Sequence, residues 1–244
     1  MIETQNLTKK FRSVTAVDGL SITAPDGKVT GFVGPNGSGK TSTMRMVVGL
    51  DRPTSGTATV DRRRLRDHPA PQRVVGAVLD SKGAPDGMTA RAHLRWLATA
   101  GRISAARADH LLEVVGLGAV ATRRIGDLSL GMRQRLGIAA ALLGDPGTII
   151  LDEPVNGLDP DGVRWVRDLM RRLAAEGRCV LVSSHLMAEM QQTADRIVII
   201  GAGALMGQFD IADLEEHGSS LEDVYLRLTA GAAQHRAGSD EGNT

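Results

Sequence analysis

The sequence has one cysteine, Cys179, and very few aromatic residues. A single thiol excludes an intramolecular disulfide framework and any metal site made of several cysteines. Because Cys179 lies in an apolar run, we expect it to be buried and reduced. With three phenylalanines, two tryptophans and one tyrosine in 244 residues, the core must be built from aliphatic side chains.

Long apolar runs and a strong charge of one sign are also absent. No stretch approaches the about 20 apolar residues that a membrane-spanning helix needs, and residues 1–6 are polar, unlike the core of a signal peptide. Basic and acidic residues number 29 and 28, which gives a net charge of +1, whereas a generic nucleic-acid binder carries a basic excess. We therefore expect a cytoplasmic globular protein that does not bind nucleic acid.

Short apolar runs alternate with longer helical patterns along most of the chain. Five runs are continuous rather than alternating, as expected for strands covered on both faces: 29–33, 74–79, 148–151, 179–183 and 196–200. Helical patterns occur between several of them, at 41–50, 162–175 and 186–194. This order predicts an α/β fold with a mainly parallel sheet.

Two regions depart from this alternation. Residues 2–7, 14–24 and 57–60 are strand-like with polar breaks, which predicts an antiparallel β side sheet. Residues 88–143 are helical in pattern and rich in Arg and Ala, which predicts an inserted α-helical lobe. We expect the arginines of this lobe to form solvated helix faces, the alternative being a partner-binding patch; they are Arg91, Arg95, Arg102, Arg107, Arg123 and Arg124.

Together, these patterns predict one domain over residues 1–229. Its core would comprise residues 1–87 and 144–229, with the helical lobe inserted between them. Residues 230–244 are small and polar, and we expect this tail to be disordered.

The segment 34–41, Gly-Pro-Asn-Gly-Ser-Gly-Lys-Thr, fits the phosphate-loop pattern G-x-x-x-x-G-K-[ST]. It follows a predicted strand and opens a predicted helix, so backbone N–H groups and the helix N-terminus can hold one anion. Lys40 would face the β- and γ-phosphates of a nucleotide, and Thr41 would offer its hydroxyl to Mg²⁺. The alternative is an accidental glycine turn. The predicted nucleotide contacts are Gly34, Asn36, Gly37, Ser38, Gly39, Lys40, Thr41 and Ser42.

A second motif places two adjacent carboxylates, Asp152 and Glu153, directly after the predicted strand 148–151. Open α/β sheets bind ligands at the carboxyl ends of their strands. Asp152 would hold Mg²⁺, mostly through water, and Glu153 would accept the proton of the water that attacks the γ-phosphate. Alone, the pair also fits a capped helix start. Together with the phosphate loop, it predicts a site that hydrolyses ATP with Mg²⁺ as cofactor.

Residues 128–135, Leu-Ser-Leu-Gly-Met-Arg-Gln-Arg, resemble the signature of ATP-binding-cassette (ABC) ATPases, usually written Leu-Ser-Gly-Gly-Gln. Further family motifs follow in order, with Gly-Leu-Asp-Pro at 157–160 and Ser-Ser-His at 183–185. The Ser-Leu-Gly-Met form, and Leu-Glu-Asp-Val-Tyr at 221–225, are similar to the drug- and antibiotic-export branch, whose membrane subunits are separate chains. The resemblance implies a P-loop NTPase core.

The resemblance also implies a homodimer or pseudo-dimer with two ATP molecules at its interface. Each ATP would lie on the phosphate loop of one subunit and be capped by Ser129 and Gly131 of the other. Leu130 and Met132 depart from the common signature, but the Ser129 hydroxyl and the Gly131 backbone are kept. The alternative at Ser129 is a plain helix start.

Three further residues match family positions. Phe11 falls where the family stacks an aromatic ring on adenine, although a core phenylalanine fits the local sequence as well. His185 matches the histidine that contacts the γ-phosphate and positions the water, which makes it a predicted catalytic residue beside Lys40 and Glu153; alone, it fits a surface residue. Asp159 matches the aspartate that communicates across the dimer, and its Asp-Pro step also fits a helix start.

Asp80 is the largest departure from the family pattern. The family places a glutamine here that touches Mg²⁺ and senses the membrane subunit, whereas an ionised aspartate is shorter and cannot donate a hydrogen bond. Either Asp80 faces the metal through a water, or it turns away and leaves Thr41 and Asp152 as the protein ligands. The first alternative predicts that nucleotide binding depends more on Mg²⁺ than it would with glutamine.

We therefore predict the ATP-hydrolysing subunit of an ABC transporter, most consistent with an exporter. A separate integral-membrane permease would hold it at the inner face of the cell membrane. An ABC ATPase of the DNA-repair type would carry a long coiled coil, and no sustained heptads occur here. A soluble nucleotide switch that is not coupled to transport is the second alternative, although Glu153 favours hydrolysis over a dead switch.

Overall fold

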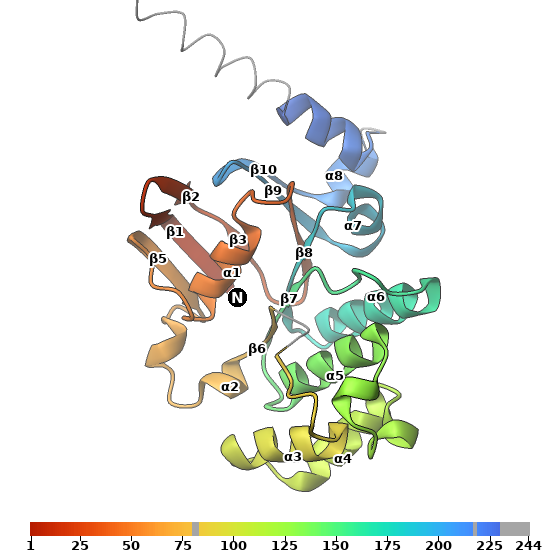
Figure 1. The fold of residues 1–244 in the computed structure, drawn as a ribbon. Helices are drawn as coiled ribbons and strands as arrows, with labels where there is room; N and C mark the ends of the chain where they lie inside the picture. Colours follow the sequence, from red (N-terminus) through yellow and green to blue (C-terminus); the bar gives the residue numbers. More distant parts are fainter. Residues whose placement is uncertain (80–82, 217–218, 230–244) are drawn as a thin grey trace, which may run out of the picture.

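The computed structural model describes residues 1–79, 83–216 and 219–229, and Figure 1 shows two sheets with helices packed around them. Asp80, one of the predicted metal ligands, lies outside the described residues, as does the predicted tail 230–244. Within the described part of the chain, no helix is long and apolar enough to cross a membrane.

The larger sheet has the strand order β10-β9-β4-β8-β7-β6. Neighbouring strands are parallel except β10, which runs antiparallel to β9. This arrangement confirms the predicted α/β fold. The sequence interpretation missed β10, because none of its residues is fully buried and it therefore has no continuous apolar run. The strands are β4 (Val29–Val33), β6 (Val75–Val78), β7 (Thr148–Asp152), β8 (Cys179–Ser184), β9 (Arg196–Gly201) and β10 (Ala204–Asp210).

Helices cover both faces of this sheet, which explains the continuous apolar runs. Leu181 of β8 packs in one cluster with side chains of α1 (Lys40–Val47), and its neighbour Val182 packs in another with side chains of α6 (Pro160–Ala175). Cys179 is a free thiol buried on the α1 face, as predicted. Burial raises the pKa of this thiol to about 11, so it stays protonated and unreactive at neutral pH.

A smaller antiparallel sheet lies beside α1 (Figure 1), as the sequence predicts. Its central strand, β1, pairs with the other three. β1 reaches Phe11 rather than ending at Leu7, because its second half pairs with β2. The strands are β1 (Ile2–Phe11), β2 (Val14–Leu20), β3 (Thr23–Ala24) and β5 (Ser55–Val60).

The segment predicted as a helical lobe contains α3 (Ala90–Ala100), α4 (Ala105–Val114) and α5 (Leu130–Leu142), joined by the short helices η2 (Gly118–Val120) and η3 (Ile125–Asp127). Each long helix begins at a hydroxyl that accepts a backbone N–H three residues further on, which stabilises its first turn. The three capping residues are Thr89, Ser104 and Ser129. α3 and α4 lie at the edge of the molecule, and α5 lies between them and the larger sheet (Figure 1).

Several arginines of this segment form ion pairs. Arg95 of α3 donates two hydrogen bonds to Asp109 of α4, and Arg91 lies 3.5 Å from the same carboxylate. The Arg95 guanidinium lowers the pKa of Asp109 below its usual value. Arg107 of α4 lies 3.0 Å from Asp145, just before β7. These arginines therefore connect α3 to α4 and α4 to the segment before β7. Their side chains are partly exposed, as expected for solvated helix faces.

Shorter elements correct some predicted boundaries. Val74 ends the short helix α2 (Pro71–Val74) instead of starting a strand, because Pro71 favours a helical turn at its first position. α1 stops at Val47 rather than Leu50, before the left-handed Gly49. The remaining helices are η1 (Leu65–Asp67), α7 (Met187–Thr193), α8 (Ile211–Glu216) and a last helical segment over 221–229.

Candidate functional site

The phosphate-loop segment connects β4 to α1, and its backbone is tightly packed. A Cβ on Gly34 would lie 2.4 Å from the carbonyl oxygen of Ile200, and a Cβ on Gly39 would lie 2.5 Å from the carbonyl oxygen of Ala16. Gly39 also has a φ of +102°, which a residue with a side chain rarely adopts. Only glycine fits at these two positions, so the fold requires both glycines of this turn.

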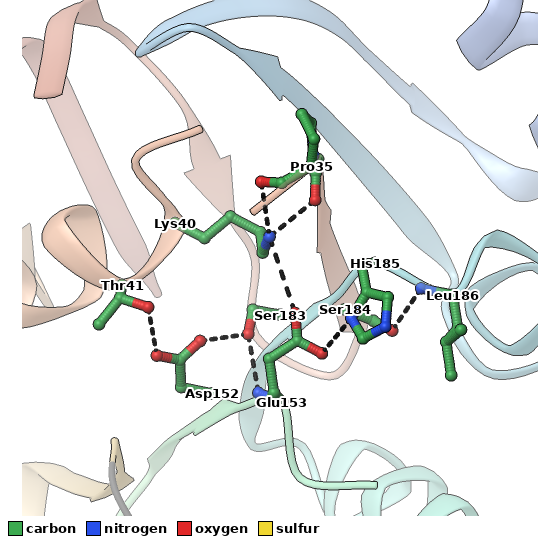
Figure 2. Close-up of polar contacts among 10 residues, drawn as sticks. Pro35, Lys40, Thr41, Asp152, Glu153, Ser183, Ser184, His185 and Leu186 are labelled. Atoms are coloured by element: carbon green, nitrogen blue, oxygen red, sulfur yellow. Dashed lines mark hydrogen bonds and ion pairs between the residues drawn. The ribbon is translucent and has the colours of Figure 1, made fainter. Parts of the chain in front are cut away.

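Lys40 is the first residue of α1, and its side chain folds back over the loop (Figure 2). It is 5% exposed, and its ammonium donates hydrogen bonds to the carbonyl oxygens of Gly34 at 2.7 Å and Pro35 at 3.2 Å. The same nitrogen lies 3.7 Å from Oε1 of Glu153. Because a buried charge needs polar partners, these oxygens hold the cation between the loop and the carboxylate.

Thr41 and Asp152 are joined directly. The Thr41 hydroxyl donates to Oδ2 of Asp152 at 2.6 Å, and the Ser183 hydroxyl donates to the other carboxylate oxygen. Ser183 also accepts the backbone N–H of Glu153 at 2.8 Å. The sequence interpretation did not include Ser183 among the site residues. Its position at the end of β8, next to β7 in the sheet, is the signal that could have found it.

Glu153 and His185 form the other half of the site. His185 Nδ1 lies 2.9 Å from Oε2 of Glu153, in the loop that follows β8 (Figure 2). Glu153 has a φ of +48°, a left-handed conformation that is uncommon for a residue of this type and occurs often at functional sites. The two predicted catalytic residues therefore lie in contact, although 32 positions separate them in the chain.

Two buried polar atoms of the site have no hydrogen-bond partner, Ser38 Oγ in the loop and Glu153 Oε1. Buried polar atoms are normally paired, so these two suit a site completed by a polar ligand. The loop adds backbone N–H groups and a helix N-terminus, which suit an anion. The site thus offers donors for phosphate oxygens on one side and a carboxylate on the other.

Ser129, Gly131 and Asp159 lie outside the hydrogen-bond network around Lys40 and Glu153. Ser129 caps α5, its hydroxyl accepting the Met132 N–H at 3.2 Å, and Asp159 caps α6 by accepting the Gly162 N–H at 2.9 Å. The helix-start interpretation of both residues is therefore confirmed. Within the described residues, no hydrogen bond or ion pair joins Ser129, Gly131 or Asp159 to the Lys40 network.

Phe11 lies at the surface. It is 46% exposed at the end of β1, and the Lys9 ammonium lies 4.9 Å from the centre of its ring. The alternative of a core phenylalanine is therefore wrong. Stacking of Phe11 on adenine stays a prediction.

More than half of the chain, residues 17–156, matches the family described as ABC transporter. The chain belongs to this family. The matched range contains the phosphate loop, the signature segment 128–135 and the carboxylate pair, so the family motifs and the site geometry concern the same residues.

Individual members of the ABC transporter family match this chain over most of its length. It is 38% identical to the bacitracin transport ATP-binding protein BcrA of Enterococcus faecalis, over 88% of this chain and 71% of BcrA. It is 34% identical to the lantibiotic transport ATP-binding protein SrtF of Streptococcus pyogenes, over 92% of this chain and 96% of SrtF. A solved structure of an ATP-binding subunit of an ABC transporter matches with a TM-score of 0.82 and 26% identity, covering 94% of this chain and 99% of that one.

Membership of this family establishes the activity. The ABC transporter chain is an ATPase subunit that binds ATP and powers transport with its hydrolysis. The transporter subunit that the sequence predicts is therefore favoured over the alternative of a soluble nucleotide switch.

Proposed function

We propose that ATP lies on the phosphate loop and that Glu153 takes the proton of the attacking water. The observation that supports this most is the arrangement around Glu153, with the Lys40 ammonium 3.7 Å from one carboxylate oxygen and a His185 nitrogen 2.9 Å from the other. A cation, a base and a positioning group converge at one sheet edge, as phosphoryl transfer requires. The proposed nucleotide contacts in this loop are Gly34, Asn36, Gly37, Ser38, Gly39, Lys40, Thr41 and Ser42.

Glu153 suits the role of general base because its position is held from two sides. Ser183 holds its backbone N–H, and His185 holds Oε2, which leaves Oε1 buried without a hydrogen-bond partner, 3.7 Å from the Lys40 ammonium. The Lys40 ammonium, now on the carbonyl oxygens of Gly34 and Pro35, would exchange them for the β- and γ-phosphate oxygens. Lys40 and the loop amides would then balance the charge that develops on the phosphates.

We propose Mg²⁺ as the cofactor, held by Thr41 and Asp152. One hydroxyl and one carboxylate, 2.6 Å apart, fit an ion that takes its other ligands from water and substrate phosphates. In the described part of the chain, no group of three or more His, Cys, Asp or Glu side chains forms a metal cage. When bound, the ion would neutralise phosphate charge. Participation of Asp80 stays a prediction.

We propose further that two ATPase subunits pair, as a homodimer or with a related chain. Ser129 is exposed at the start of α5, where its hydroxyl and the Gly131 N–H can cap a phosphate of the partner's ATP. Asp159, at the start of α6, would contact the partner across the interface. Phe11, exposed on the side sheet, would stack on adenine.

The proposed partner of this dimer is a separate integral-membrane permease that carries the transported molecule. The relatives named for bacitracin and lantibiotic transport support an antibiotic-like cargo. The signature form and residues 221–225, which resemble the export branch, support the export direction. The chain would work at the inner face of the cell membrane, attached through its permease. ATP binding would close the dimer, and hydrolysis would reopen it.

A single substitution tests the site. Glu153→Gln keeps the shape of the side chain but cannot take a proton, so we expect turnover to fall at least about 100-fold, the usual contribution of a general base, while ATP still binds. The ATP-bound dimer should accumulate, measured by size-exclusion chromatography with light scattering. Glu222→Gln, an exposed position on the last helical segment, is the matched control. Turnover of Glu153→Gln above about a tenth of the natural rate would exclude Glu153 as the base.

A further inference from the structure

Leu130 stands where the common ABC signature has glycine, and its side chain reaches a second functional segment. A Cβ on Gly157 would lie 2.5 Å from Cδ2 of Leu130, so the leucine packs directly across Gly157. Leu158 makes the converse contact, because a Cβ on Gly131 would lie 3.3 Å from its Cδ2. Leu130 of the signature thus covers Gly157, and Leu158, next to Gly157, covers Gly131 of the signature.

This leucine–glycine contact continues along the two helices that follow. The Arg135 guanidinium of α5 lies 4.4 Å from the centre of the Trp165 ring of α6, a cation–π distance. Arg135 also donates to the carbonyl oxygen of Val115 at 3.2 Å. α5 and α6 therefore also touch in their second turns, and the Leu130 contact lies at the start of α5, inside the signature.

Gly157 is connected to Glu153 by a short and constrained loop. The N–H of Asn156 donates to the carbonyl oxygen of Glu153, and the N–H of Leu158 donates to that of Val155, both at 3.2 Å. Gly157 itself has a φ of +72°. These two hydrogen-bonded turns connect the backbone of Gly157, which Leu130 covers, to the backbone of Glu153 within four residues.

From this geometry we infer that Leu130 is a positioning residue that links the signature of a subunit to the general base of the same subunit. The inference rests on the proposed dimer, in which Ser129 and Gly131 cap the partner's ATP. Leu130 lies between these two residues and is half exposed, so it would respond to an ATP seated there. Occupation of one ATP site would then adjust Glu153 in the other. A glycine at this position has no side chain to make the link.

Leu130→Gly tests the inference, with ATP affinity, kcat and the Hill coefficient of hydrolysis as readouts. We expect ATP affinity at the phosphate loop to stay within about twofold, because Lys40 and its neighbours are untouched. The kcat should fall by about three- to tenfold, the size of coupling between contacting residues, and the Hill coefficient should fall towards one. Leu130→Met should restore both values. Leu50→Gly, which removes another exposed leucine, is the matched control.

Leu158→Ala removes the other leucine of this contact, and we expect it to lower kcat and the Hill coefficient in the same way. It replaces Leu130→Gly as the test if that variant does not fold. Because both leucines act in one contact, the double variant should lose little more kcat than the more affected single variant. An unchanged kcat and Hill coefficient in Leu130→Gly would overturn the inference, and so would a natural chain with a Hill coefficient of one. Loss of the ATP-driven dimer would also overturn it, by making Leu130 a dimer contact. Failure of the proposed dimer is distinguishable, since the natural chain would then stay a monomer in the presence of ATP.

Discussion

At the scale of single residues, the backbone of Glu153 shows how the fold serves the chemistry. A left-handed glutamate is strained, and the strain is retained because several contacts hold the residue. β7 leads directly into Glu153, Ser183 holds its N–H, and His185 holds its carboxylate. In this conformation the side chain faces Lys40 instead of continuing the strand direction.

Lys40 is the residue whose loss should affect ATP binding most directly. Lys40→Ala removes a charged donor from a buried site, and such hydrogen bonds contribute about 1.5–3 kcal/mol, so we expect ATP affinity to fall by about 10- to 100-fold. Equilibrium titration with a fluorescent ATP analogue measures it. Lys28→Ala, at the opposite end of β4 and paired with Asp210, is the control and should bind normally. Unaltered affinity in Lys40→Ala would contradict the phosphate-loop assignment.

At the scale of elements, the site depends on which strands are neighbours. β7 lies beside β8, and β8 lies beside β4, all three parallel. Their carboxyl ends therefore meet at one edge, which brings the phosphate loop, the carboxylate pair and His185 together (Figure 2). The start of α1 adds Lys40 and Thr41 to this edge, whereas Ser129 and Asp159 cap α5 and α6 outside it.

Asp159 allows the structural and functional roles of one helix start to be separated. Asp159→Ala removes the cap of α6 and should lower the free energy of unfolding by about 1 kcal/mol, measured by urea denaturation. Asp159→Ser keeps a capping oxygen and should restore most of this stability. If Asp159 also acts across the dimer, ATP turnover of Asp159→Ser should stay low although the helix is capped. Full turnover in Asp159→Ser would limit the residue to capping.

At the scale of the whole molecule, the chain belongs to a transporter family, and we propose that it works in an assembly with other subunits. The described residues contain a site for ATP and no helix able to cross a membrane, whereas the family powers transport. The signature and the phosphate loop share no described hydrogen bond or ion pair within one chain. In the proposed assembly, the signature of a second ATPase subunit would complete the ATP site, and a permease would carry the transported molecule.

Co-expression with the reading frames that neighbour its gene tests this assembly, and we expect one of them to encode an integral-membrane protein. We expect the chain to move to the membrane fraction only when that protein is present, and to co-purify with it in detergent. Lys40→Ala should co-purify equally well, because attachment does not need ATP binding. A chain that stays entirely in the supernatant with its membrane neighbour present would contradict the transporter assembly.

Local sequence was sufficient to predict the segments that form the candidate site and most strands of the core. Residues 34–41 carry their own glycine spacing, and the apolar runs of β4, β7, β8 and β9 are long enough to be recognised individually. Such patterns are readable because they depend on backbone freedom and burial, which act over a few neighbouring residues. The missed strand, β10, is held by pairing with β9 rather than by its own burial.

Contacts between residues far apart in the sequence determined the features of the site that no local pattern predicts. Exposure of Phe11, the role of Ser183 and the left-handed Glu153 follow from strand pairing and packing. The contact of Leu130 with Gly157 likewise joins residues whose nearness no local pattern encodes. The physical reason is that strand order and helix packing minimise the free energy of the whole core, so the neighbours of a side chain are known only after the chain has folded.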